Sequence, residues 1–150
     1  MNSADMRIEQ QLTVLLRRVQ RIHMVTATGD VHLERSSYGI LCQLADEGPQ
    51  RLGALASAFG LDPSTITRQV QALESLGLAQ RTTDPTDRRA SILDLTAEGS
   101  DALDRTRRHR RDRLQQVLAH WDAADREDFA RLLTTFNESV EALMLADARS

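Results

Sequence analysis

Apolar residues recur at steps of three and four along most of the chain, which is the period of one face of an α-helix. Near the N-terminus they predict a helix that ends at Gly29-Asp30 and carries Ile8, Leu12, Leu15, Val19 and Ile22. Near the C-terminus they predict a helix capped by Asp122 that carries Phe129, Leu132, Leu133, Phe136, Val140 and Leu143. A single small domain between the two helices cannot cover both stripes. They either pack against each other within one chain or form a dimer interface.

The middle of the chain predicts three shorter helices. The first begins near Ser36 or Ser37, which are good N-cap residues, and stops at Gly48-Pro49. The second runs roughly from Leu52 to Phe59, and the third runs from Pro63 to its end at Gly77. Two helices joined by a turn that contains glycine give the outline of a helix-turn-helix.

Two short runs with strand-like patterning follow this motif. Residues 78–83 and 90–95 read as the strands of a hairpin, and Asp84-Pro85 supplies the turn chemistry between them. Thr96 then caps a helix that is expected to continue through Trp121. The predicted fold class is mainly α with a small β-hairpin wing, a winged helix-turn-helix with N- and C-terminal dimerisation helices. Residues 31–99 form the winged domain in this interpretation, and residues 1–30 with 100–150 form the helical dimerisation region.

Composition narrows the class of protein. The chain has 150 residues and a net charge of −3, which argues against nonspecific coating of nucleic acid but allows a local basic surface. No apolar run approaches the roughly 18 residues of a membrane span, and the polar N-terminus lacks a signal core, so we expect a cytoplasmic protein with no membrane partner. The one cysteine excludes an internal disulfide.

The first turns of the third short helix carry candidate DNA contacts. Its apolar positions face the core by spacing, which leaves toward solvent Ser64, Thr65, Thr67, Arg68 and Gln69. A recognition helix reads the major groove from its N-terminal residues. Arginine can hold guanine, glutamine can hold adenine, and serine or threonine can bind phosphate or base edges. The alternative is an ordinary solvated helix face.

The hairpin tip carries two further candidates, Arg88 and Arg89. A narrow minor groove has an enhanced negative potential that attracts arginine. Asp87 is expected to orient a guanidinium there through a charge-assisted bond, and Arg51 completes the predicted DNA-binding set. Basic and acidic residues are equal in number between positions 51 and 95. The prediction of DNA binding therefore rests on where the arginines lie and not on the net charge of this region. The alternative is a solvated polar tip.

Three segments resemble the MarR (multiple antibiotic resistance regulator) family of bacterial repressors. They are Leu73-Glu74-Ser75-Leu76-Gly77-Leu78, then Asp84-Pro85-Thr86-Asp87-Arg88-Arg89-Ala90, then Leu95-Thr96-Ala97-Glu98-Gly99. The resemblance implies a homodimer that binds double-stranded DNA at a pseudo-palindromic operator. It also implies that Arg89 enters the minor groove and that Thr67-Arg68 contacts the major groove.

The resemblance further implies a repressor that a small aromatic or phenolic ligand releases. The pocket for this effector would lie near His23, Met24, His32 and Tyr38. Two other functions remain open at this point. One is a winged-helix module that binds protein, and the other is an oxidant-responsive regulator that acts through Cys42.

The remaining patterns favour structural roles. Cys42 lies between apolar positions, which favours a buried, inert thiol. The four histidines show no close ligand pair, so we expect no metal and no cofactor. No catalytic motif is present, so the sequence predicts that the protein is not an enzyme. The arginine-rich run over residues 105–113 is interpreted as a solvated face, with DNA steering or interhelix ion pairs as the alternatives.

Overall fold

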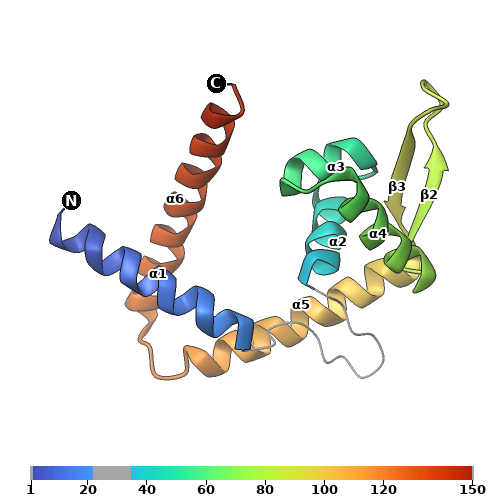
Figure 1. Cartoon of the computed structure of the whole chain (residues 1–150). Coiled ribbons are helices and arrows are strands. Elements are labelled where there is room, and N and C mark those ends of the chain that lie inside the picture. The colour runs from blue at the N-terminus through green and yellow to red at the C-terminus, as the bar shows by residue number, and fades with distance from the viewer. Residues whose placement is uncertain (1, 22–34, 150) are drawn as a thin grey trace. The chain divides into compact units, whose positions relative to one another are not determined.

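The computed structural model describes residues 2–21 and 35–149 (Figure 1). In chain order its elements are α1 (Ser3–Arg21), α2 (Arg35–Glu47), β1 (Gln50–Arg51), α3 (Leu52–Phe59), α4 (Pro63–Ser75), β2 (Ala79–Thr83), β3 (Ser91–Leu95), α5 (Ala97–Val117) and α6 (Ala123–Asp147). The chain divides into two compact units, residues 1–111 and residues 112–150. The predicted class, a mainly helical winged helix-turn-helix with a small antiparallel sheet, is confirmed.

One apolar core holds the winged domain together. Each of α2, α3, α4 and α5 contributes one apolar face, and β2 and β3 contribute the sheet residues. The largest fully buried apolar side chains are Ile40, Leu41, Leu55, Ile66, Val70, Leu73, Leu78, Leu93 and Leu103. Because α4 buries three of these residues, its polar first turns are left to face outward.

The turn between α3 and α4 follows the sequence prediction. Gly60 ends α3 in the left-handed conformation, with φ of 59°. The N–H of Leu61 then donates to the carbonyl of Ala56 at 3.0 Å, which satisfies a carbonyl that the helix end leaves free. Pro63 opens α4, where its missing N–H costs nothing. These two signals fix the boundaries of the helix-turn-helix.

The sheet has three strands in the order β1-β3-β2, all antiparallel. The hairpin runs from the pair Ala79–Leu95 to the pair Thr83–Ser91, and β1 adds the pair Arg51–Ile92 on the other edge of β3. The sequence predicted only the two hairpin strands. It missed β1 because two residues are too few to show an alternating pattern.

The start of α5 is joined closely to the end of the helix-turn-helix. The hydroxyl of Thr96 accepts a hydrogen bond from the N–H of Gly99 at 2.9 Å, which confirms the predicted cap. The same hydroxyl donates to the carbonyl of Gly77 at 2.6 Å. A Cβ at Gly99 would lie 1.8 Å from the carbonyl oxygen of Leu78, so only glycine fits there.

The predicted C-terminal boundary of the helix that follows the wing is wrong. Helix α5 ends at Val117, and Trp121, predicted to lie in it, follows in the turn. There Trp121 packs edge-on against Phe129, with ring centroids 5.4 Å apart. The guanidinium of Arg126 donates to the carbonyls of Leu118 at 2.6 Å and Trp121 at 3.3 Å, so it occupies carbonyls that the helix end leaves free. The side chain of Asp122 caps α6 by accepting from the N–H of Asp125 at 2.7 Å, as predicted.

Helix α6 exposes the apolar face that the sequence predicted, and α1 exposes Ile8 and Leu15 of its predicted stripe, whereas Leu12 is half-buried. On α1 the exposed residues include Met6, Ile8, Leu15 and Leu16. On α6 they are Phe129, Leu132, Leu133, Phe136, Val140, Leu143, Met144 and Leu145. The predicted end of the first helix, at Gly29-Asp30, lies outside the described residues. No helix within the described ranges has the length and apolar content needed to cross a membrane.

Candidate nucleic-acid interface

The first turns of α4 present most of the predicted contact residues on the surface of the winged domain. Ser64 and Arg68 are exposed, while Thr65 and Thr67 are half-buried. The hydroxyl of Thr67 donates to the carbonyl of Pro63 at 2.8 Å and keeps its lone pairs for another donor. Within the described part of the chain, no hydrogen bond or ion pair engages the guanidinium of Arg68. Arg68 is therefore available to an external acceptor.

Gln69 lies differently from the other members of the predicted set. It is half-buried, and its Oε1 is enclosed without a hydrogen-bond partner among the described residues. Its amide would have to turn outward to hold adenine, as the sequence predicted. A buried amide oxygen without a partner is unfavourable, so such a turn would relieve a cost.

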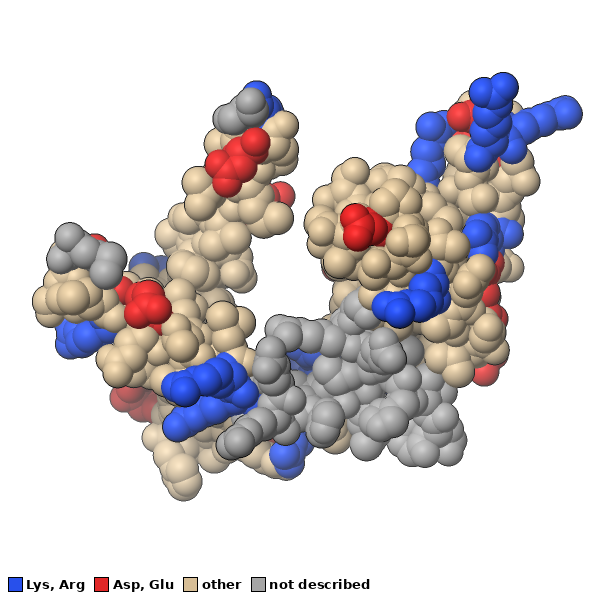
Figure 2. Space-filling model, viewed as in Figure 1, with Lys and Arg blue, Asp and Glu red and all other residues tan. Residues whose placement is uncertain are grey.

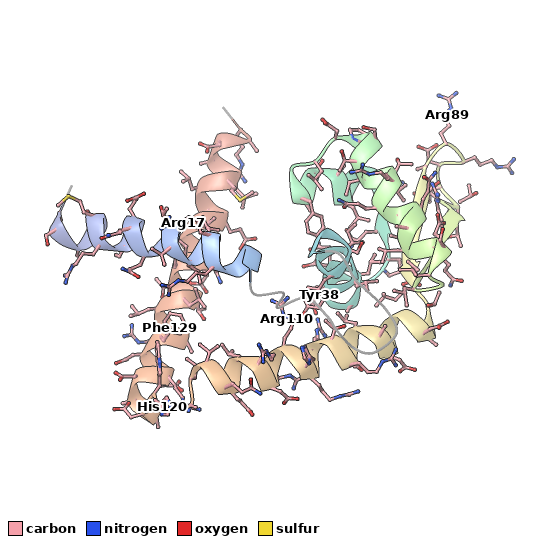
Figure 3. All side chains as sticks on the ribbon, turned by 60° about the horizontal axis from the view of Figure 1, so that its bottom comes forward. Arg17, Tyr38, Arg89, Arg110, His120 and Phe129 are labelled. Carbon is pink, nitrogen blue, oxygen red and sulfur yellow. The ribbon has the colours of Figure 1, made fainter. Side chains whose placement is uncertain are left out.

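The wing tip presents Arg88 and Arg89, both exposed, beyond the ends of β2 and β3 (Figures 2 and 3). Two backbone hydrogen bonds of 3.0 Å close the tip. The N–H of Asp84 donates to the carbonyl of Ala90, and the N–H of Ala90 donates to the carbonyl of Asp87. Asp87 was expected to orient a guanidinium. Instead its carboxylate accepts from the backbone N–H of Arg89 at 3.0 Å, so it fixes the main chain at the tip.

Arg51 has a partner that the sequence did not reveal. Its guanidinium forms an ion pair with Asp84 at 2.5 Å and donates to the hydroxyl of Thr86 at 3.3 Å. The side chain of Asp84 is only 5% exposed, whereas that of Arg51 is 53% exposed. Arg51 was predicted to bind DNA, and the structure engages its guanidinium within the protein. The signal that sequence reasoning missed was Asp84, which it interpreted as turn chemistry only.

The carboxyl of Asp84 is held in its charged form. The backbone N–H of Thr86 and then its hydroxyl, each 2.8 Å from Oδ1, lower the pKa of Asp84, and Arg51 lowers it further. Hydrogen bonds to the charged form of a carboxyl favour ionisation, and here they outweigh the effect of burial, which raises the pKa.

A second ion pair joins α4 to β2. Both oxygens of Glu74 accept from Arg81, with Nε at 3.2 Å and Nη2 at 2.7 Å. This is the two-pronged geometry that a guanidinium and a carboxylate favour. The recognition helix and the first wing strand are therefore connected by charge as well as by packing.

An open cleft of about 400 Å³ lies between the first turn of α3 and the wing, lined by residues 51–54 and 89–91. Both Arg51 and Arg89 are among the residues that line it. Arg68 on α4 and Arg88 and Arg89 at the wing tip expose further guanidinium groups, which are suited to a polyanion. The planar guanidinium group of arginine can donate two parallel hydrogen bonds to a phosphate.

The predicted effector residues are only partly described, because His23, Met24 and His32 lie outside the described residues. Tyr38 on α2 is half-buried, and the guanidinium of Arg110 stacks over its ring at 4.5 Å (Figure 3). Burial, together with a hydrogen bond to the thiol of Cys42, raises the pKa of Tyr38 above its ordinary value of 10.0. Cys42 itself packs against the core but is only half-buried, so the expected burial of its thiol is incomplete.

The arginine-rich run of α5 is not wholly a solvated face. Arg107 pairs with Asp46 of α2 at 3.1 Å, and Arg110 stacks on Tyr38. These contacts correspond to the interhelix alternative that the sequence left open. In the part of the chain that is described, no group of three or more His, Cys, Asp or Glu side chains is placed to hold a metal ion.

The fold and the exposed arginines define the class of protein as a DNA-binding winged helix-turn-helix. The sequence model of the MarR family matches residues 33–91 of this chain. Over 133 residues the chain is 39% identical to the HTH-type transcriptional regulator YxaD of Bacillus subtilis (strain 168), and the match covers 88% of this chain and 92% of YxaD. The chain belongs to the MarR family. It is thus a DNA-binding transcriptional regulator and not an enzyme.

Solved structures agree with this assignment. The structure of RV1404 from Mycobacterium tuberculosis matches with a TM-score of 0.75 and 29% identity, covering 94% of this chain and 96% of RV1404. The PcaV transcriptional regulator from Streptomyces coelicolor, solved in complex with its natural ligand, matches with a TM-score of 0.63 and 29% identity, covering 84% of this chain and 91% of PcaV.

Proposed function

We propose that the protein is a homodimeric repressor that reads a pseudo-palindromic operator and is released by a small-molecule ligand. The observation that carries the proposal is the set of exposed guanidinium groups on α4 and on the wing tip, none of which has an ion-pair partner among the described residues. Arg68, with Ser64, Thr65 and Thr67, would contact the major groove, where arginine can hold guanine through two hydrogen bonds. Arg88 and Arg89 would enter the adjacent minor groove. Gln69 joins the set only if its amide turns outward.

The exposed apolar face of α6 supports the dimer. Its large side chains, from Phe129 to Leu145, are 39–63% exposed in the single chain. An apolar stripe of this length is a typical interaction surface. In this proposal residues 1–30 and 100–150 form the dimerisation region, and residues 31–99 form the DNA-binding domain. A two-fold axis would place two α4 helices on one face of the DNA, about one helical turn apart.

Repression and release follow from the same geometry. A dimer seated on its operator excludes other proteins from that DNA. The guanidinium of Arg110, which stacks over the ring of Tyr38, supplies a cation that suits an aromatic or phenolic anion as effector. PcaV was solved in complex with its natural ligand, which supports a ligand-responsive regulator here. Such a ligand would act by favouring a state whose helices no longer match the operator spacing.

The test is a selection of bound duplexes from a random DNA library with the purified protein. We expect an enriched pseudo-palindrome whose half-sites are about one helical turn apart. Arg68→Ala should weaken binding by about 1–3 kcal/mol and relax specificity at one base pair. Arg89→Ala should weaken binding to all sequences. Arg131→Ala on α6 is the matched control, because it removes an exposed arginine outside the winged domain.

The alternative function, a winged-helix module that binds protein, makes the opposite prediction. Such a module does not need exposed arginines on both α4 and the wing. Selection that enriches no sequence, together with unchanged DNA affinity in both arginine variants, would favour it over the repressor.

A further inference from the structure

We propose that Arg51 is a wing-positioning residue, which acts on DNA binding through Asp84 and Thr86 rather than by touching DNA. Its ion pair would hold the wing tip at a fixed distance from α3, so that Arg89 is presented to the minor groove. This inference rests on the proposed DNA-binding function. We call the contact among Arg51, Asp84 and Thr86 the wing latch.

Both carboxylate oxygens of Asp84, the acidic residue of the wing latch, have partners within the protein. Asp84 is only 4% exposed. Its Oδ1 accepts from the N–H and the hydroxyl of Thr86, both at 2.8 Å, and its Oδ2 accepts from Arg51 at 2.5 Å. A nearly buried carboxylate is tolerated only when its oxygens are paired. Removing Arg51 would therefore leave the carboxylate of Asp84 without its cation, and the wing tip would have to move to expose that charge to water.

The wing latch spans the whole sheet. The backbone of Arg51 is fixed by pairing with Ile92 of β3, and α3 begins at the next residue, Leu52. Asp84 directly follows β2, on the other side of β3. The ion pair thus ties the tip end of β2 to the start of the helix-turn-helix. The pairing of β2 with β3 does not by itself connect Asp84 to the start of α3.

A short series of bonds carries this constraint from Asp84 to Arg89. The N–H of Asp87 donates to the carbonyl of Asp84 at 3.3 Å, and the N–H of Arg89 donates to the carboxylate of Asp87 at 3.0 Å. Arg51 and Arg89 also line the same cleft. The wing latch would therefore set the distance between the wing tip and α3.

The competing explanation is that Arg51 contacts a phosphate directly, because its side chain is 53% exposed. Asp84→Asn separates the two explanations. An asparagine keeps the oxygen that accepts from Thr86 but loses the charge that holds Arg51. If Arg51 binds phosphate, Asp84→Asn frees it, and affinity stays unchanged or rises. If Arg51 acts through the wing latch, Asp84→Asn weakens binding as Arg51→Ala does.

The first measurement is affinity for the duplex enriched by selection. We expect Arg51→Ala and Asp84→Asn each to weaken binding roughly tenfold, and the double variant to be no weaker than either single one, because residues in one network are not additive. In an Arg89→Ala background, Arg51→Ala should have little further effect. Additive losses, or tighter binding by Asp84→Asn, would overturn the proposal.

The second measurement needs no DNA, so it separates failure of the wing latch from failure of the repressor proposal. Hydrogen–deuterium exchange should become faster across residues 84–91 in Arg51→Ala and in Asp84→Asn. Arg68→Ala is the control, because it removes another exposed arginine that makes no contact with the wing among the described residues. Unchanged exchange in the two variants would refute the wing latch even if the protein binds DNA as proposed.

Discussion

Arg81 of β2 holds both carboxylate oxygens of Glu74 of α4, with its Nε at 3.2 Å from one and its Nη2 at 2.7 Å from the other. The recognition helix and the wing are therefore joined at the C-terminal end of α4. The pair of Arg51 and Asp84 joins the wing to the helix-turn-helix again at the foot of the tip. Two ion pairs thus brace the elements that carry the candidate DNA contacts.

Replacing Glu74 should cost a modest amount of stability. The two side chains are 29% and 28% exposed, so solvent screens the pair in part, and Glu74→Gln should lower the free energy of unfolding by about 1 kcal/mol or less. Urea denaturation measures this loss. The control is Asp128→Asn, which breaks the more exposed Arg131–Asp128 pair of α6 and should change stability by less. Equal losses in the two variants would contradict the bracing role.

Gly99 should not tolerate any side chain. Because a Cβ would lie 1.8 Å from the carbonyl oxygen of Leu78, Gly99→Ala must displace backbone and should destabilise the fold by about 3 kcal/mol or more. Gly53→Ala is the matched control, since the space around Gly53 in α3 is open. Alanine there should stabilise by roughly 0.4–1 kcal/mol. Thermal unfolding followed by circular dichroism compares the two variants, and a harmless Gly99→Ala would show that the close approach is misplaced.

Stability should depend on pH through Asp84. Its pKa in the folded state lies below the ordinary value of 3.8. The carboxylate therefore contributes stability that is fully present above that ordinary value and is lost as pH falls through the folded pKa. The difference in unfolding free energy between the wild type and Asp84→Asn should be largest near neutral pH and should shrink in acid. Denaturant titrations across this range measure it, and a difference that grows in acid would contradict the assignment.

A charge placed on the apolar face of α6 should separate the proposed dimer. Phe136 is 41% exposed in the single chain and lies in the middle of the stripe. Phe136→Glu would bury a carboxylate in the interface and should weaken association by about a hundredfold or more. Analytical ultracentrifugation measures the mass, with Glu138→Gln on the same helix as control. A wild-type protein that sediments as a monomer would refute the dimer itself.

Local patterns predicted most element boundaries. Helix α3 was expected from Leu52 to Phe59 and has these limits, because its start and its glycine cap are encoded by neighbouring residues. The caps by Thr96 and Asp122 were found for the same reason. Predictions failed where an ending depends on distant groups. Helix α5 stops at Val117, and the carbonyl of Leu118 beyond it is occupied by Arg126 of the next helix.

In the candidate site, too, the features that depend on neighbouring residues were predicted, and those that depend on distant residues were not. The exposed positions Arg68, Arg88 and Arg89 followed from helical spacing and from turn chemistry, which are local properties of the chain. The inward amide of Gln69 and the pairing of Arg51 with Asp84 did not, because they depend on which side chains meet across the sheet. A pattern can show that an arginine is exposed, but it cannot show what partner lies beside it.

By itself, the sequence determined the order of the helices, the winged helix-turn-helix and the family, because periodicity, caps and short motifs are written in adjacent residues. Only the tertiary structure decided that β1 completes the sheet and that the wing is fastened through Arg51. It also decided that Gly99 must lack a side chain, because the backbone of Leu78, in the turn between α4 and β2, lies against it. Each of these features is a contact between residues far apart in the chain, and such contacts exist only once the core has brought the elements together.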